Sequence, residues 1–240
     1  MIALKARAPV VFSKFRGQYA TEGRAGNYLW GIGDGEKPSG PSIVVARDAV
    51  VVITAKSTKI PAKYIASTID GTRVMTYSNI RALFTKANAT EAIHAYTDDA
   101  NSGARRFFTR RLTTDGTPLQ IGKQAIVVRN DMDMVDRVAN DPYGIGYCSS
   151  AVADIDRVQI IGLKTPDGHI YFFPRETPKS RWTLPNKLDW PLLRTLYVAY
   201  GGKAWTAAGD GIVNVMLAPN APGARALRAG PLFKASYLAP

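Results

Sequence analysis

The residues best suited to chemistry are four arginines that follow Ser102-Gly103 within Gly103–Leu112, a segment that is predicted to be a helix. Guanidinium groups donate paired hydrogen bonds that fit the oxygens of phosphate or carboxylate, so this segment is a candidate anion site. A helix turns by about 100° per residue, and the arginines therefore spread over roughly 240° of its surface. They cannot all face one cleft, and a solvated basic helix face is the alternative interpretation. They are Arg105, Arg106, Arg110 and Arg111.

Other side chains with catalytic or metal-binding chemistry are few. Cys148 is the single cysteine, which excludes an intrachain disulfide and a cysteine metal site. His94 and His169 share no His-x-x-x-His spacing, so no metal site is predicted. We expect Cys148 to be a buried small apolar group, His94 to be structural and His169 to be exposed. No Ser/His/Asp order and no nucleotide fingerprint stands out, so we predict neither an enzyme nor a cofactor.

Two further motifs imitate binding loops. Asp131 and Asp133 resemble the opening of a calcium loop, but its glycine and its terminal glutamate are missing. Acidic residues in the first turn of a capped helix explain them better. Gly31-Ile32-Gly33-Asp34-Gly35 resembles a phosphate-cradling loop, but it lacks the third glycine and the Lys-Ser/Thr pair. We interpret it as a plain turn.

Composition indicates an ordinary globular chain with a strong positive charge. The chain has 240 residues, a mass of 26.0 kDa and a net charge of +12, which suits one or two domains and anionic partners of any kind. Lysines and arginines are dispersed, so specific nucleic-acid binding is not expected. No apolar run reaches the roughly 18 residues that span a bilayer, so no membrane span is predicted. No signal peptide is visible, which leaves a cytoplasmic protein or a chain that begins after a removed leader.

Strands alternate with short helices along the chain, which predicts an α/β domain with a mainly parallel sheet. Ser42–Thr54 contains two β-branched runs separated by Arg47-Asp48, a pattern that is typical of buried strands. Ser78-Asn79 is predicted to cap a helix over Ile80–Lys86. Further helices are predicted at Val11–Tyr19, from Pro61, and at Met132–Ala139 and Gly211–Leu217. Further strands are predicted at Ile2–Ala6, Ile93–Tyr96, Gln124–Val128, Gly144–Cys148, Val158–Leu163, His169–Phe173 and Trp190–Val198.

Five segments, in order, resemble the phosphate-binding proteins of ABC importers, a branch of the type II periplasmic-binding-protein fold. They are residues 41–52, 79–86, 100–108, 141–147 and 189–198. Residues 41–52 are similar to the strand that crosses from the first lobe to the second, and residues 141–147 to a Gly-Ile-Gly-Tyr strand. The resemblance implies two lobes with mainly parallel sheets. We expect residues 1–45 and 186–240 to form a reduced first lobe, and residues 46–185 to form the second lobe.

The resemblance also implies a ligand site between the lobes. Backbone N–H groups and hydroxyls at helix N-termini hold phosphate in the family, and an arginine and a carboxylate complete the shell. Asn101, Ser102, Gly103 and Arg105 would supply the donors of the second lobe. Two departures stand against this site, because Asp98 falls where the family has an arginine and Ala104 where it has a threonine.

These observations lead to two hypotheses of function. The first is a non-catalytic binding protein for a small phosphate-like oxyanion, periplasmic or extracellular by resemblance, with an ABC permease as its partner. The alternative is a structural or interaction protein that keeps the fold, has lost the ligand, and assembles with itself or with a macromolecule. The short first lobe and the positive charge favour the alternative.

Overall fold

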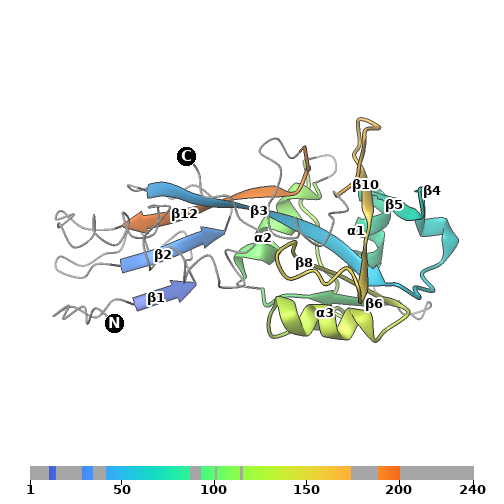
Figure 1. The fold of residues 1–240 in the computed structure, drawn as a ribbon, viewed down its shortest axis with the longest axis horizontal. Helices are drawn as coiled ribbons and strands as arrows, with labels where there is room; N and C mark the ends of the chain where they lie inside the picture. Colours follow the sequence, from blue (N-terminus) through green and yellow to red (C-terminus); the bar gives the residue numbers. More distant parts are fainter. Residues whose placement is uncertain are drawn as a thin grey trace.

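A computed structural model gives the fold (Figure 1) and describes residues 11–14, 29–34, 42–86, 93–100, 102–113, 116–173 and 189–200. The helices are α1 (Tyr77–Lys86), α2 (Gly103–Arg111) and α3 (Asp131–Ala139), with a 3-10 turn at Ala62–Tyr64. The strands are β1 (Val11–Lys14), β2 (Leu29–Asp34), β3 (Ser42–Ala55), β4 (Ser67–Ile69), β5 (Thr72–Thr76), β6 (His94–Thr97), β7 (Ile126–Val127), β8 (Gly144–Ser149), β9 (Val158–Ile160), β10 (Gly162–Lys164), β11 (Ile170–Tyr171) and β12 (Leu193–Tyr200).

Two sheets organise these elements. The larger has the order β1-β2-β12-β3-β8-β6-β7, with β9 also paired to β3, and the smaller has the order β11-β10-β5-β4. β1, β2 and β12 lie at one end of the molecule, and the helices gather at the other (Figure 1). None of the helices in the described part of the chain is long and apolar enough to cross a membrane.

The long strand β3 joins the two ends. Its first part pairs with β12, and its last part pairs with β8 on one edge and β9 on the other. A strand of 14 residues extends over roughly 45 Å, which is long enough to run through both groups of strands. The strand predicted over Ser42–Thr54 is confirmed as the single strand β3, and Asp48 within it forms a buried ion pair with Arg194.

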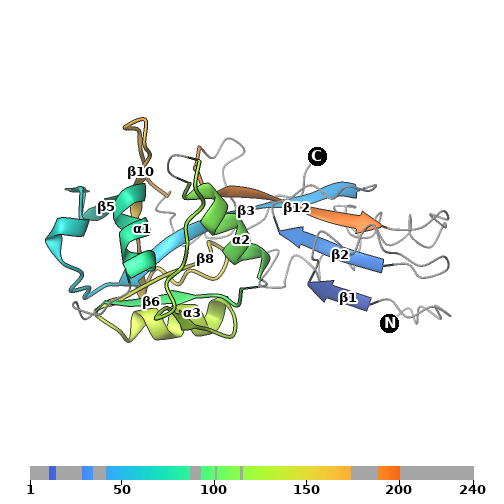
Figure 2. The same ribbon diagram turned by 180° about the vertical axis from the view of Figure 1, so that it is seen from behind.

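Strand β8 is covered on both faces. Successive side chains of a strand point to opposite faces, so Gly146 and Tyr147 face different layers. Gly146 lies beneath Met134 and Val138 of α3, whereas the Tyr147 ring contacts Phe84 of α1 and Phe108 of α2. Helix α3 therefore covers one face of the sheet, and α1 and α2 cover the other (Figure 2).

The helix starts follow from local capping chemistry. The Asn130 side chain caps α3 by accepting the Asp133 N–H at 3.0 Å, and Asp133 accepts the Arg129 N–H at 3.0 Å in return. This confirms the interpretation of Asp131 and Asp133 as first-turn acids. The cap predicted at Ser78-Asn79 was wrong, because α1 begins at Tyr77 and the Thr76 hydroxyl accepts the Asn79 N–H at 3.0 Å.

Several predicted elements differ in detail. The larger sheet is mixed rather than mainly parallel, because β3 pairs antiparallel with β12, β8 and β9. Val11–Lys14 is a strand, not part of a helix, and Gly31–Asp34 lies in β2, not in a turn. The helix from Pro61 is only a 3-10 turn. The strand predicted over Val158–Leu163 divides at Ile161 into β9 and β10, which belong to different sheets. The elements predicted at Ile2–Ala6 and Gly211–Leu217 lie outside the described residues.

Candidate functional site

The start of α2 lies at the carboxyl end of three neighbouring parallel strands. β6 pairs in parallel with β7 and with β8, so these strands end at the same edge of the sheet. The chain leaves β6 at Thr97 and enters α2 at Gly103. Helix α2 also contacts β2, whose C-terminal end points toward it in both views (Figures 1 and 2). In open α/β sheets this edge is where ligands bind.

Three of the four predicted site residues gather at this start of the helix. Ser102 is buried, and its hydroxyl donates to the Asp98 carboxylate at 3.0 Å instead of capping the helix. The Arg105 guanidinium donates to the backbone carbonyl of Asp98 at 3.0 Å. Gly103 is the buried first residue of α2. The fourth, Asn101, lies outside the described residues.

Asp98 is therefore the centre of the local hydrogen bonds. Its carboxylate accepts from Ser102, its carbonyl accepts from Arg105, and its N–H donates to the Tyr147 hydroxyl at 3.3 Å. The side chain is only 5% exposed. In the sequence, Asp98 stands out only as a departure from the family, whereas the fold uses it to hold the Ser102 and Arg105 side chains near the helix start.

The Tyr147 ring supports this loop from below. Its hydroxyl lies 2.9 Å from the Thr97 hydroxyl, and its ring stacks on Phe108 with centroids 4.0 Å apart. Burial and the nearby Asp98 charge raise the pKa of Tyr147 above its ordinary range, so the phenol stays neutral. The pattern Gly-Ile-Gly-Tyr predicted the strand but not this contact.

The distal arginines of α2 do not join the site. Arg110 and Arg111 are exposed in the last turn, where positive charge suits the helix dipole, and Arg111 lies over the Phe107 ring. The basic helix face proposed as the alternative therefore describes this end of α2.

A second group of polar side chains lies where β3, β8 and β12 meet. Arg194 donates to one Asp48 oxygen at 2.9 and 2.6 Å, and the Ser149 hydroxyl donates to the other at 2.7 Å. Asp131, at the start of α3, accepts the Ser149 N–H at 3.0 Å. This group was not predicted from the sequence. The one indication in the sequence was Asp48, a charged residue inside an otherwise apolar strand. A buried charge requires a partner, so such a residue predicts a buried ion pair.

Carboxylates dominate the electrostatics of this group. Loss of hydration on burial raises the pKa of Asp131 to about 6, and the charges of Asp98 and Asp48 add to the effect. The hydrogen bond from Ser149 and the charge of Arg194 act in the opposite direction. The carboxylates of Asp48, Asp98 and Asp131 thus influence one another in a chain whose net charge is +12.

Comparison with solved structures identifies the fold. The chain superposes on a protein named as a phosphate ABC transporter substrate-binding protein, with bound phosphate, from Clostridium perfringens, at a TM-score of 0.59 and 15% identity over 88% of this chain and 79% of the other. An ABC-type phosphate transport receptor from Vibrio cholerae gives a TM-score of 0.55 and 14% identity over 88% and 79%. A high-affinity periplasmic phosphate-binding protein (PfluDING), bound with phosphate, gives a TM-score of 0.53 and 11% identity over 92% of this chain and 78% of the other. No protein-family model and no curated protein sequence matches the chain.

The chain has the fold of the type II periplasmic binding proteins. The predicted resemblance to phosphate-binding proteins is confirmed at the level of structure. At identities of 11–15% the likeness establishes the fold and not the ligand.

The cysteine and the two histidines lie in different surroundings. Cys148 is buried, and burial raises the pKa of its thiol well above the ordinary value, as expected for an inert cysteine. The His94 ring contacts the Asp141 carboxylate at 2.6 Å, and Tyr96 donates to the same carboxylate oxygen at 2.9 Å. His169 is exposed, as predicted. Within the described ranges, no three His, Cys, Asp or Glu side chains could hold a metal ion together.

Proposed function

We propose that the protein is a non-catalytic binding protein for a small phosphate-like oxyanion, held at the start of α2. The observation that carries this proposal is the placement of Ser102, Gly103 and Arg105 at a helix N-terminus next to β2. A helix N-terminus combines unsatisfied N–H donors with a partial positive charge, and a guanidinium adds a fork of donors. The fold, shared with phosphate-bound structures, supports the same ligand class.

The surroundings of Ser102 favour a protonated oxyanion. Because the Ser102 hydroxyl donates to Asp98, its oxygen offers lone pairs, and the Asp98 carboxylate offers only acceptors. Hydrogen phosphate carries a proton that such acceptors bind, whereas sulfate at neutral pH carries none. We therefore expect phosphate to bind and sulfate to be rejected by the buried carboxylate.

The remaining parts of the proposal follow from the same function. We propose that residues 1–45 and 186–240 form the first lobe and residues 46–185 the second, with the ligand between them. An export location, periplasmic or extracellular, and docking to an ABC permease belong to this proposal as well. No catalysis is proposed, and the structures that support the fold are named as binding proteins and a transport receptor.

Calorimetric titration with phosphate tests the function. We expect micromolar or tighter binding by the native chain and no heat from sulfate. The double variant Ser102→Ala with Arg105→Ala should weaken phosphate binding at least ~100-fold, since each lost charge-assisted bond is worth about 1.5–3 kcal/mol. The matched control is Thr109→Ala with Arg110→Ala, which removes one hydroxyl and one guanidinium at the far end of the same helix.

The controls also separate loss of binding from loss of folding. Circular dichroism should show both double variants folded, and Arg105→Lys, which keeps the charge without the fork, should bind with intermediate affinity. If the Ser102 and Arg105 double variant binds phosphate like the native chain, the site lies elsewhere.

The alternative function is a structural or interaction protein that has lost the ligand. Its supporting observation is the buried Asp98, which already takes the Ser102 hydroxyl and the Arg105 guanidinium. No heat at millimolar phosphate would favour this alternative, and a sizing run on the purified chain would then show whether it assembles with itself.

A further inference from the structure

A pocket of about 450 Å³ lies at the junction of the two sheets, and its lining residues are not those of the candidate site at the start of α2. β9 of the larger sheet and the first residues of β5 of the smaller sheet both contribute to its lining. A volume of this size matches ordinary small-molecule pockets, which run from about 300 to 1,000 Å³. The pocket is thus large enough for an organic ligand.

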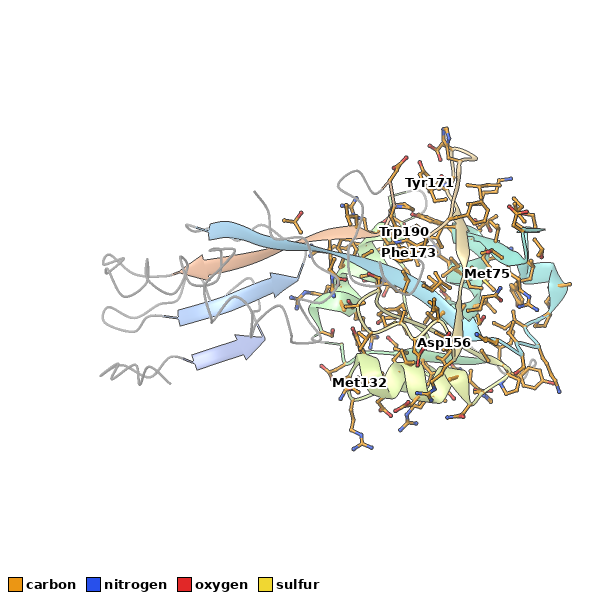
Figure 3. The ribbon with its side chains drawn as sticks, viewed as in Figure 1. Met75, Met132, Asp156, Tyr171, Phe173 and Trp190 are labelled. Carbon is orange, nitrogen blue, oxygen red and sulfur yellow. The ribbon has the colours of Figure 1, made fainter. Side chains whose placement is uncertain are left out.

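Apolar side chains form one wall of this pocket. Ile155, Val158 and Ile160 come from β9 and the turn before it, and Phe173 comes from the segment after β11. The Phe173 ring is held edge-on against Trp190, with centroids 5.5 Å apart (Figure 3). The Ile155 side chain is 39% exposed, although it is large and apolar. This wall suits a hydrocarbon or aromatic body.

The pocket lining also carries a positive charge that is held in place by hydrogen bonds. The Arg73 guanidinium donates to the Gln159 side-chain oxygen at 2.6 Å, and the Gln159 amide donates to the Gly71 carbonyl at 3.0 Å. The Asp70-Gly71 turn, with positive φ at both residues, fixes that carbonyl. A held guanidinium loses less entropy when it binds an anion.

The charges that line the pocket are positive. Lys56, just after β3, is the second cationic lining residue. Within the described part of the chain, no ion pair joins a carboxylate to either Lys56 or Arg73. Asp70 and Asp156 adjoin lining residues in sequence but do not themselves line the pocket. The pocket therefore pairs an apolar wall with two positive groups.

We infer that this pocket binds a small organic monocarboxylate with an apolar body. The carboxylate meets Arg73 and Lys56, and the hydrocarbon lies against Ile155, Val158 and Phe173. An inorganic oxyanion leaves the apolar wall uncovered, so this ligand class differs from that of the α2 site, and the inference does not depend on the proposed function.

Titration with octanoate, followed by amide chemical shifts, tests the inference. We expect saturable shifts at Gly71, Thr72 and Ile160, and none at these amides from inorganic phosphate. Arg73→Met should weaken the binding of octanoate at least tenfold. Lys56→Met, which changes an exposed side chain and preserves the fold, should weaken it several-fold. Arg157→Met, which removes a half-exposed arginine paired with Asp136, should leave the affinity unchanged.

Four results would overturn the inference. Octanoate could give no saturable shift up to millimolar concentration, or it could shift residues outside the pocket. Methyl octanoate, which has the same body without the charge, could bind as tightly as octanoate. Finally, Arg73→Met and Lys56→Met could both bind octanoate like the native chain, which would remove the assigned role of the charges.

Discussion

At the residue scale, the buried aspartates near the centre of the molecule differ in the partners that stabilise their negative charge. Asp48 has Arg194 and Ser149 as direct partners. Asp131 accepts the Ser149 N–H, and its pKa rises to about 6 because burial removes its hydration and, to a lesser extent, because the Asp98 and Asp48 charges lie nearby. A raised carboxyl pKa links folding to pH, because the folded chain binds the proton more tightly than the unfolded chain.

The sign of this linkage gives a prediction for Asp131. Its contribution to stability is fully present below the unfolded pKa of 3.8 and is lost as pH rises through about 6. The variant Asp131→Asn keeps the acceptor for the Ser149 N–H but cannot ionise. Because the pKa of Asp131 in the folded chain is about 6, urea unfolding should show that this variant gains stability relative to the native chain as the pH rises from 4 to 7. Asp136→Asn, on the exposed side of α3, is the control. Parallel pH profiles of native chain and Asp131→Asn would contradict the prediction.

At the element scale, the contact between α3 and β8 depends on a glycine. A Cβ added at Gly146 would lie 2.5 Å from the Met134 sulfur and 2.9 Å from a Val138 methyl group. Because glycine has only a hydrogen where other residues carry a Cβ, the helix can approach the strand closely, and side chains of α3 fill the space above it.

Overpacking at Gly146 is therefore expected to destabilise the fold. Gly146→Ala should lower the free energy of unfolding by about 1–3 kcal/mol. In the Met134→Ala background the same change should cost much less, because the clashing sulfur is gone, so the two changes should couple by about 0.5–3 kcal/mol in a double-mutant cycle measured in urea. Additive effects of the two changes would show that the clash is relieved in another way.

At the scale of the whole molecule, β3 and β12 run side by side between its two ends. Asp48 and Arg194 are direct partners in their register, and both side chains are almost completely buried. Trp190 adds a bond from its indole N–H to the Val50 carbonyl at 2.8 Å. These contacts fix the two strands against each other where the chain passes from one group of strands to the other.

Removal of one partner should destabilise the whole fold. Arg194→Met leaves the Asp48 charge buried, which is expected to cost about 3–5 kcal/mol in the free energy of unfolding. Arg137→Met removes a half-exposed arginine from its pair with Asp133 and should cost no more than about 1 kcal/mol. If urea unfolding shows the same loss of unfolding free energy for both variants, the buried pair contributes no more to stability than the exposed pair.

Much of the fold was predictable because the strongest patterns are local. The α2 and α3 helices and the buried β8 strand follow from periodicity and capping within short windows. The errors at β1, β2 and the two halves of residues 158–163 occur where neighbouring strands, distant in sequence, decide the conformation. β2, for example, is a strand because it pairs with β1 and β12 despite its glycines.

The sequence by itself determined the α/β class, the type II binding-protein fold and the segment Ser102–Arg105 at the start of a helix. Only the tertiary structure decided the surroundings of that segment. Asp98 looks like a defect in the sequence, yet in the fold it holds Ser102 and Arg105, and Asp48, Arg194 and Ser149 meet from three strands. The reason is physical: helix and strand patterns depend on near neighbours, whereas the pairing of buried charges depends on residues that only the folded chain brings together.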